Sequence, residues 1–214
     1  MTNNTKTINQ NSAITKLTVT AMLAAVAVGL QYLEFPVPLV PSFLKMDLSD
    51  IPELIGAFII GPFGGALIAL LKNLIHLPAT QTAGVGELAN FLLGAVFSLT
   101  AGAIYKRNKT KKSAILACFC GTFAMAAVSF PINLWIVYPF YAKLFGGMDT
   151  ILGLYKTVLP ASDTLPKSLL IFNIPFTLVK GVLCSVVTIL VYKPLSNLIK
   201  QMNKQINGKR KPAA

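Results

Sequence analysis

Charge is scarce in this sequence, and negative charge is the scarcest. Only 12% of the 214 residues are Asp, Glu, Lys or Arg, and just seven of those are acidic. A soluble domain carries about 25% charged residues. Hydrophobic residues make up 54% of the chain, and the mean hydropathy is +0.66. This composition excludes an ordinary soluble domain. It predicts an integral membrane protein with room for about six spans of roughly 20 residues.

Groups that could carry out chemistry are also few. The chain has one histidine, His76, which we expect to be a loop residue, and three cysteines in apolar runs, Cys118, Cys120 and Cys184. Cysteines without ligand partners nearby are expected to be small buried hydrophobes rather than metal ligands. The sequence has no plausible Ser–His or Cys–His pair. It also has no G-x-x-x-x-G-K-[ST] string, so it has no P-loop for ATP. We therefore expect neither an enzyme nor a metal site.

The charges that are present are segregated along the sequence. Basic residues cluster at Lys106–Lys112 and again at Lys193–Lys211, whereas the acidic residues fall on what reads as the other side of a membrane. Short cytoplasmic loops of membrane proteins are enriched in Lys and Arg. The net charge of +12 therefore indicates membrane orientation, with both termini cytoplasmic, rather than a nucleic-acid partner. The outer residues are Glu34, Asp47, Asp50, Glu53, Glu87, Asp149 and Asp163. Because these carboxylates are expected near the outer surface, a proton-coupled pump is disfavoured.

The apolar stretch Ile51–Ile75 has two readings. It is either one span, or Gly61-Pro62 and Gly64-Gly65 divide it into two short helices that turn back. With one span, the basic loop Lys106–Lys112 would face the opposite side from the basic C-terminal tail. With two short helices both basic segments face the cytoplasm, as the positive-inside rule requires. The sequence therefore predicts two short helices, which are tolerated where they are buried in protein or line a cavity.

The other elements follow from the apolar runs and their boundaries. A polar tail at residues 1–12 lacks the apolar core of a cleaved signal peptide, and a first helix is expected at about Ala13–Leu33. An apolar outer loop follows, because its successive prolines break helices. After the two short helices we expect an outer loop at His76–Val85, helices at Gly86–Tyr105, Ser113–Phe140 (kinked at Pro131) and Lys167–Tyr192 (with Pro175 inside), an outer loop ending at Pro166, and a basic tail at 194–214.

Polar residues inside the apolar runs point to a binding site, because such residues are costly at membrane depth. Asn173, Thr177 and Lys180 are spaced to share one face of the last helix. Lys180 lies about 20 Å into that helix and needs a partner for its charge. The others are expected in the outer half of the membrane, and they are Lys72, Asn73, Glu87, Asn90 and Asn133. Any one of these could merely hold helices together. As a set below an apolar loop, they favour a pocket for a polar ligand.

Small residues recur every four positions on the first helix, at Ala21, Ala25 and Gly29. This spacing lets another helix approach closely. The stripe is interpreted either as internal packing or as a docking surface for a partner protein.

The segment Pro41–Ile55 reads PSFLKMDLSDIPELI. It resembles the first outer loop of riboflavin-binding S-components, the membrane-embedded substrate-binding subunits of energy-coupling factor (ECF) transporters. The resemblance continues through Gly61-Pro62, Leu71-Lys72-Asn73 and Gly86–Phe91, and ends with Pro175–Gly181.

The resemblance implies an all-α fold with six transmembrane helices, the S-component fold, forming one substrate-binding domain over residues 1–214. It also implies an outward-open site, capped by the first loop and built from the outer parts of the last three helices. In the family, an Asn and an Asn-x-x-Lys motif bind the flavin ring. Asn133 and Lys180 match two of these positions, whereas Thr177 replaces the second Asn, and Asn173 one turn earlier is a candidate to compensate. The stripe at Ala21 and Ala25 resembles the family's docking site for the membrane coupling subunit.

The sequence is therefore interpreted as a high-affinity riboflavin-binding subunit of a vitamin importer in a bacterial plasma membrane. Leu44 suits the ring, Asn133, Thr177 and Lys180 its polar edge, and Lys45, Asp47 and Asn73 the ribityl hydroxyls. Glu87, Asn90 and Asn173 complete the expected substrate-binding set. The expected partners are riboflavin, lipid, a coupling subunit and two ATPase subunits that use ATP, with no cofactor in this chain. Alternatives are a related flavin such as FMN, another vitamin, or a stand-alone secondary transporter, which would work without ATPases.

Overall fold

The computed structural model describes residues 2–38, 40–41 and 43–207. Leu39 and Ser42 of the first loop, and residues 208–214 of the expected basic tail, lie outside the described residues. The helices are α1 (Thr2–Tyr32), α2 (Asp50–Ile59), α3 (Pro62–His76), α4 (Val85–Arg107), α5 (Lys111–Ile132), α6 (Tyr138–Leu144), α7 (Met148–Val158), α8 (Leu165–Ser168) and α9 (Ile174–Asn207). The short elements are strands β1 (Phe35–Pro36) and β2 (Lys45–Met46), the 3-10 turn η1 (Leu77–Ala79), and the π-helical segments η2 (Asn133–Val137) and η3 (Leu169–Asn173).

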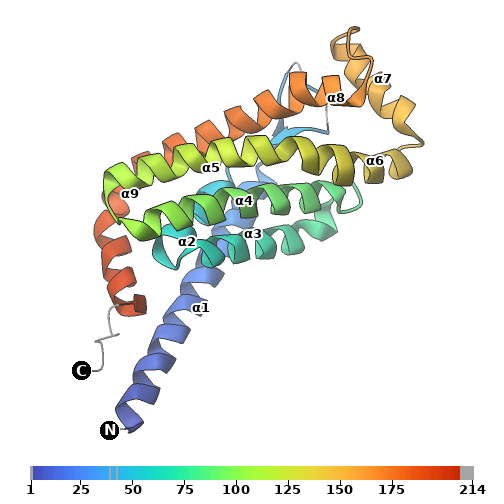
Figure 1. The fold of residues 1–214 in the computed structure, drawn as a ribbon. Helices are drawn as coiled ribbons and strands as arrows, with labels where there is room; N and C mark the ends of the chain where they lie inside the picture. Colours follow the sequence, from blue (N-terminus) through green and yellow to red (C-terminus); the bar gives the residue numbers. More distant parts are fainter. Residues whose placement is uncertain (1, 39, 42, 208–214) are drawn as a thin grey trace.

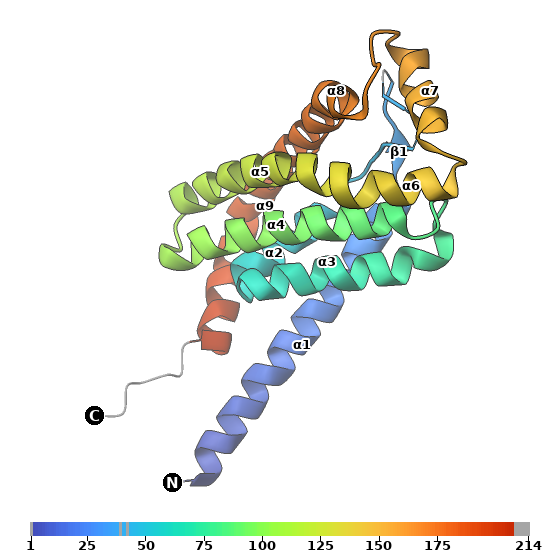
Figure 2. The same ribbon diagram turned by 45° about the vertical axis from the view of Figure 1, so that its right-hand side comes forward.

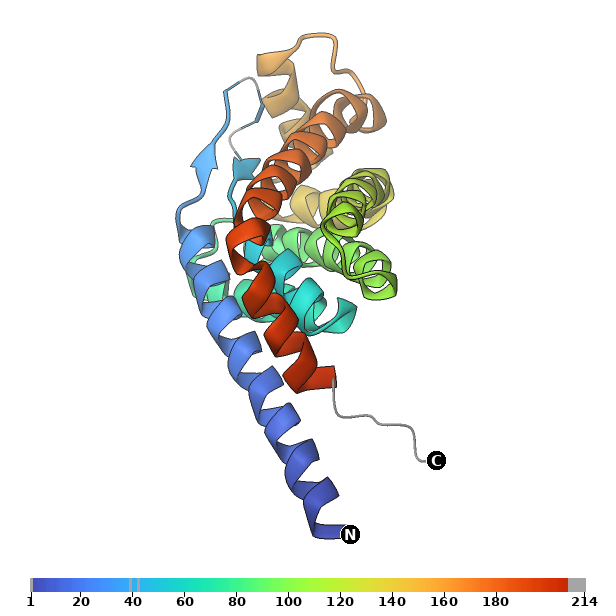
Figure 3. The same ribbon diagram turned by 90° about the vertical axis from the view of Figure 1, so that its left-hand side faces the viewer.

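Helices α3, α4 and α5 lie side by side, and α9 packs across α5 and α2 (Figure 1). Helix α1 lies against α3 and α2, where Ala24 and Ala27 pack on Ile68, and its N-terminal half projects beyond the bundle (Figures 2 and 3). The shared core gathers apolar side chains of α2, α4, α5 and α9. The half of the bundle away from the basic segments has a second cluster of aromatic and aliphatic residues, contributed mainly by α6, α7 and η3.

The predicted division of Ile51–Ile75 into two helices is confirmed. The break lies at Gly61, whose φ of 119° is a conformation that favours glycine, and Pro62 begins α3. The ten residues of α2 cover only about 15 Å at 1.5 Å per residue. Five other segments of the described chain are long and apolar enough to cross a membrane. The fold is thus helical and membrane-embedded, while six spans stay a prediction.

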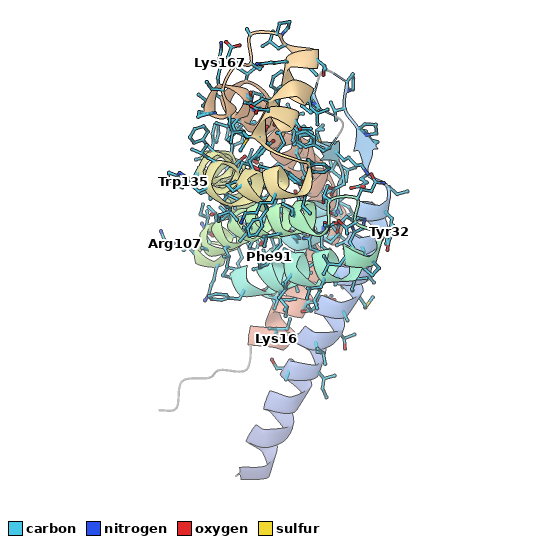
Figure 4. The ribbon with its side chains drawn as sticks, turned by 90° about the vertical axis from the view of Figure 1, so that its right-hand side faces the viewer. Lys16, Tyr32, Phe91, Arg107, Trp135 and Lys167 are labelled. Carbon is cyan, nitrogen blue, oxygen red and sulfur yellow. The ribbon has the colours of Figure 1, made fainter. Side chains whose placement is uncertain are left out.

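The two basic segments meet at one end of the molecule, as the charge argument required. The Lys109 Nζ donates to Asn203 Oδ1 at 2.6 Å, which joins the α4–α5 loop to the C-terminal part of α9. The N-terminal part of α1 and the C-terminal part of α9 lie toward this end in the ribbon (Figure 1). Lys167 lies near the top of the molecule in Figure 4, and Lys16 lies in its lower half.

Three predictions about polar segments were wrong. Residues 2–12 continue α1 rather than forming a tail, and residues 194–207 continue α9 through Pro194. This C-terminal part is anchored by buried Ile199 and Ile206 and by a hydrogen bond from Asn203 Nδ2 to the Phe58 carbonyl at 3.0 Å. The outer loop before Pro166 contains the helix α7, whose Tyr155 is fully buried. Tertiary contacts stabilise helices that polar composition alone does not indicate.

Prolines lie beside both π-helical segments. Pro131 falls just before η2, and Pro139 and Pro175 follow η2 and η3. The Tyr138 N–H bonds to the Asn133 carbonyl and the Ile174 N–H to the Leu169 carbonyl, each five residues back. Because proline has no N–H, a wider turn beside it loses little hydrogen bonding. Such turns are frequent at functional sites. Here each contains an asparagine that faces the interior, Asn133 in η2 and Asn173 in η3.

Large apolar side chains cover the outside of the bundle. Phe63 is 81% exposed, Trp135 74% and Leu190 68%, and Figure 4 places Trp135 on the outer surface. Polar residues, by contrast, are buried between the helices. Soluble proteins show the opposite arrangement, with polar side chains outside and apolar ones inside. An apolar exterior suits a lipid environment, because apolar side chains lose no free energy in contact with lipid.

Candidate functional site

A cavity of about 310 Å³ lies beneath the first loop, in the half of the bundle away from the basic segments. Its volume falls at the low end of the roughly 300–1,000 Å³ typical of small-molecule sites. Nine of the ten residues predicted to bind substrate line it, and they are Leu44, Lys45, Asp47, Glu87, Asn90, Asn133, Asn173, Thr177 and Lys180. The structure therefore brings together residues that lie far apart in the sequence, from Leu44 to Lys180.

At the floor of the cavity, Lys180 of the last helix forms an ion pair with Asp47 of the first loop. Lys180 Nζ lies 2.9 Å from Asp47 Oδ2 and 3.6 Å from Asp50 Oδ2, and donates to Asn90 Oδ1 at 3.1 Å. The partner that a deeply placed ammonium group requires is thus supplied by the first loop and the start of α2. These contacts tie the last helix to the segment that covers the site.

A second buried lysine lies behind this pair. Lys72 Nζ lies 2.8 Å from Asp50 Oδ1 and 2.6 Å from Glu53 Oε1, and it also donates to the Ser49 hydroxyl. Lys72, Asp50 and Glu53 are each at most 1% exposed. These carboxylates are thus buried between the helices, while their place near the outer membrane surface stays a prediction. The sequence singled out Lys72 but did not indicate its partners. The three-residue spacing of Asp50 and Glu53 places both on one face of α2, but it does not indicate which residue of α3 they contact.

Ionisation of Asp47 depends on these neighbours. Burial alone would raise the pKa of the Asp47 carboxyl, but the ammonium groups of Lys180 and Lys72 lower it below its ordinary value. The Ser49 backbone N–H donates to Asp47 Oδ1 at 2.8 Å, and the Ser49 hydroxyl also contacts this oxygen. Asp47 is therefore a carboxylate in the folded protein, and its charge offsets that of Lys180.

One wall of the cavity carries amide and hydroxyl groups. The Asn133 Nδ2 donates to the Ser129 carbonyl at 2.8 Å and to the Ser129 hydroxyl at 3.1 Å. The Asn133 Oδ1 has no hydrogen-bond partner among the described residues and is left as an acceptor. The Thr177 hydroxyl donates to the Asn173 carbonyl at 2.8 Å and lies 3.2 Å from the Ser129 hydroxyl. Thr177 thus contributes a lone pair rather than the amide hydrogens that an Asn would offer.

An aromatic wall adjoins these amides, and the sequence did not predict it. Asn173 Oδ1 accepts from Tyr155 Oη at 2.6 Å, and Asn173 Nδ2 donates to Tyr138 Oη at 3.0 Å. Burial raises the pKa of Tyr155 above its usual range, so its hydroxyl stays a donor. The ring of Phe43, from the first loop, packs against Tyr138, Tyr141 and Tyr155 with centroids 5.7–6.3 Å apart. Asn173 is therefore held in position by α6 and α7.

His76 is the last residue of α3 and is buried, not a solitary loop residue. Its Nδ1 lies 3.0 Å from Glu87 Oε1, and the Thr80 hydroxyl donates to Glu87 Oε2 at 2.7 Å. Both His76 and Glu87 line the cavity. Glu87 thus presents an acceptor-rich surface that is held by α3 and the following turn.

The first loop forms the outer cover of the cavity. Its β1 and β2 strands pair antiparallel, with Phe35 opposite Met46 and Pro36 opposite Lys45. Lys45 Nζ lies 2.6 Å from Glu34 Oε1, with both side chains about one-quarter exposed. These contacts hold the loop across the mouth of the cavity, with Phe43 directed inward.

Asn73 is the one predicted site residue that does not line the cavity. Its Nδ2 donates to the Ala69 carbonyl at 2.8 Å, and its Oδ1 accepts from Gln31 Nε2 at 3.1 Å. A direct contact with ribityl hydroxyls is thus not the role the geometry gives it. Gln31, which sequence reasoning did not single out, lines the cavity in its place. A polar residue near the end of the apolar first helix was the signal that could have identified it.

The small-residue stripe of α1 lies on the outside of the bundle. Ala21, Ala25 and Gly29 are all exposed, whereas Ala24 and Ala27 face the interior. The part of the chain that the structure describes leaves the stripe unburied, and its use as a docking surface stays a prediction.

The arrangement can bind a ligand that combines a flat apolar ring with several hydrogen-bonding groups. Rings from the first loop and α6 offer stacking surface, while the amides offer directed hydrogen bonds. Within the described ranges no cluster of three or more His, Cys, Asp and Glu side chains could hold a metal ion.

Comparison with known proteins gives a consistent result. Residues 15–192 match the model of the family described as "ECF transporter, substrate-specific component". The chain is 35% identical over 187 residues to "Riboflavin transporter RibU" of Staphylococcus aureus (strain TCH60), covering 87% of this chain and 93% of that protein. It is 31% identical over 192 residues to "Riboflavin transporter FmnP" of Bacillus subtilis (strain 168), covering 88% and 95%. A solved structure, described as "Structure and mechanism of the S component of a bacterial ECF transporter", superposes with a TM-score of 0.68 at 34% identity and covers 86% of this chain and 97% of the other.

Proposed function

This chain belongs to the substrate-specific component family of ECF transporters, and from that premise we propose that it is the riboflavin-binding membrane subunit of an ATP-driven vitamin importer. The relatives that carry the name riboflavin transporter cover nearly the whole chain, which supports a shared substrate. As a substrate-binding component, the chain is not an enzyme.

The observation that carries the proposal is the pairing of an aromatic wall with an amide wall in one cavity. Riboflavin has a flat fused ring, with a polar edge of carbonyl and N–H groups, and a polyhydroxyl tail. Phe43 and Tyr141 supply ring-on-ring contact, and aromatic pairs contribute about 0.5–1.5 kcal/mol each beyond the area they bury. Asn133, with its acceptor left over, and Lys180, which donates to Asp47 and Asn90 and keeps one of its three donors, suit the polar edge of the ring.

The substitution of Thr177 for an asparagine is compatible with this binding mode. The Thr177 hydroxyl is used by the Asn173 carbonyl, so the amide of Asn173 is the group that can take over the missing donors. One Nδ2 hydrogen of Asn173 goes to Tyr138, which leaves the other for a ligand. A site that leaves polar groups unpaired without the right ligand rejects analogues strongly.

The import cycle requires partners. With no P-loop in its sequence, the chain depends on ATPase subunits that act through a membrane coupling protein. The exposed Ala21–Ala25–Gly29 stripe is the surface we assign to that protein, because small residues permit close helix approach. We place both termini and the Lys106–Lys112 loop in the cytoplasm of a bacterial cell, with the cavity facing outward.

The proposal is tested with the purified full-length chain in detergent. Riboflavin added stepwise is expected to bind one to one with quenching of flavin fluorescence, and protein purified from cells is expected to be yellow from bound flavin. Absence of saturable riboflavin binding, together with saturable binding of another vitamin, would overturn the substrate assignment. Uptake by the chain alone in vesicles, without ATPases, would instead favour a secondary transporter.

A further inference from the structure

Gln31, near the C-terminal end of α1, carries a hydrogen-bond acceptor that the described part of the protein does not satisfy. The side chain is only 3% exposed, and its Oε1 is buried without a hydrogen-bond partner among the described residues. Buried polar atoms in native proteins almost always have a partner, so each exception needs an explanation. Gln31 also borders the cavity. A ligand bound in the cavity is therefore the candidate to supply the missing donor.

The orientation of the Gln31 amide follows from its neighbours. The Asn73 Nδ2 donates to the Ala69 carbonyl one turn earlier on α3, so the Asn73 Oδ1 must point away from that carbonyl. This oxygen accepts from the Gln31 Nε2 at 3.1 Å. Reversing the Gln31 amide would bring two carbonyl oxygens together. The hydrogen bonds from Asn73 to Ala69 and from Gln31 to Asn73 therefore fix the Gln31 Nε2 as a donor to Asn73. The Gln31 Oε1 is the atom that is left without a partner among the described residues.

The partner of this oxygen must be a hydrogen-bond donor. The nearby wall is rich in acceptors, since the Glu87 carboxylate, which receives the Thr80 hydroxyl and contacts His76, also lines the cavity. The Glu34 carboxylate lines the cavity as well, paired with Lys45. A neutral hydroxyl group can donate to such a surface without the charge repulsion that an anionic group would meet.

The position of α1 separates this wall from the ring-binding walls. Helix α1 packs mainly against α3 and α2, whereas the aromatic and amide walls are contributed by the first loop, α6 and the segments η2 and η3. A ligand whose ring lies on Phe43 and Asn133 therefore extends its chain, rather than its ring, toward Gln31. Resting on the proposed function, we propose that Gln31 is a specificity-determining residue that accepts a hydrogen bond from a hydroxyl of the riboflavin ribityl chain, with Asn73 as its positioning residue.

The test compares two flavins on matched variants of the full-length chain. Riboflavin carries the ribityl chain, and a flavin with a methyl group in its place shares only the ring. Gln31→Met keeps the length of the side chain and removes the acceptor. It is expected to weaken riboflavin binding about 5- to 150-fold, the effect of leaving a hydrogen-bonding group of the ligand unpaired, and to change methyl-flavin binding less than about twofold. Gln201→Met, an exposed glutamine of α9, is the control and should change neither.

Each outcome decides the assignment. Equal weakening of both flavins means that Gln31 supports the fold, and no change for either means that no hydroxyl reaches it; both results reject the role in specificity. If the Met variant does not fold, the Gln31→Met, Asn73→Leu double variant removes the acceptor together with the amide that would be left unpaired beside it, and it is expected to show the same selective loss of riboflavin binding. A folded double variant that keeps the full preference for riboflavin over the methyl flavin also rejects the assignment. Failure of the unmodified chain to bind either flavin rejects the proposed function itself.

Discussion

The Lys180 ammonium group lies 2.9 Å from the carboxylate of Asp47, a residue 133 positions earlier in the chain. The contact joins the helix that closes the fold to the loop that covers the cavity, and both side chains are at least nine-tenths buried. This buried ion pair therefore holds the loop that covers the cavity against the helix at its floor.

Removing one member of this pair should destabilise the protein strongly. Lys180→Gln leaves Asp47 as a buried carboxylate without its nearest cation, which costs about 3–5 kcal/mol. We expect a lower melting temperature in detergent, with part of the loss restored in the Lys180→Gln, Asp47→Asn double variant. Lys167→Gln breaks the exposed pair with Asp163, at 3.7 Å, and is the control, expected to cost less than about 1 kcal/mol. Equal effects of the two single substitutions would contradict the role of burial.

The stability contribution of Asp47 should depend on pH in a defined direction. Asp47 lies outside the segments long enough to span a membrane, and its pKa is lower in the folded protein than the ordinary 3.8. The carboxylate therefore contributes stability above its ordinary pKa, and the contribution is lost as the pH falls toward the folded value. The melting-temperature difference between wild type and Asp47→Asn should be constant between about pH 5 and 8 and shrink below about pH 4. A difference that grows on acidification would refute this sign.

Asn133→Ala is expected to weaken riboflavin binding by about 1–3 kcal/mol, because the group of the ligand that it contacts is left unpaired. Fluorescence titration measures the effect. Trp135→Phe, in the same π-helical segment but facing outward, should leave affinity unchanged. Unchanged affinity in the Asn133 variant would mean that this residue has only a structural role, through its hydrogen bonds to Ser129.

Thr177→Asn should keep riboflavin binding, and tighten it if the new amide reaches the ring directly. The substitution releases the Asn173 carbonyl from the Thr177 hydroxyl, so a small loss of stability is expected beside the gain in donors. Titration together with a melting curve separates the two effects. Complete loss of binding would mean that the hydroxyl itself is the required contact.

Bulky side chains on the exposed stripe should separate binding from transport. Ala25→Trp prevents close helix approach while leaving the cavity untouched, since residue 25 faces outward. The variant is expected to bind riboflavin in detergent, to fail to assemble with the coupling subunit, and to lose ATP-driven uptake in vesicles. Leu190→Trp, on the exposed face of α9, is the control and should retain assembly. Survival of assembly and uptake in an Ala21→Trp, Ala25→Trp double variant would place the docking surface elsewhere.

Several features of the site could be predicted because each rests on a local rule. A polar residue in an apolar run is costly wherever it lies, so Asn90, Asn133 and Thr177 could be selected without knowing their neighbours. The division at Gly61-Pro62 followed from charge and from residues that break helices. The partners of these residues could not be predicted. Nothing in the spacing of Asp50 and Glu53 on α2 indicates that both contact Lys72, and nothing near Tyr155 indicates that α7 folds back onto Asn173.

The sequence by itself determined the membrane class, the order of the main helices and most of the predicted residues in the cavity. It also determined that the two basic segments lie at the same end. Hydropathy, helix-breaking residues and the positive-inside rule act over short stretches of chain, so they can be read without the fold. The tertiary structure alone decided which charges neutralise each other, which amide atoms are left for a ligand, and that His76 and Gln31 belong to the cavity wall. These depend on contacts between segments far apart in sequence. Such contacts arise only when the helices pack, since a buried polar group is satisfied by whichever partner the packing brings to it.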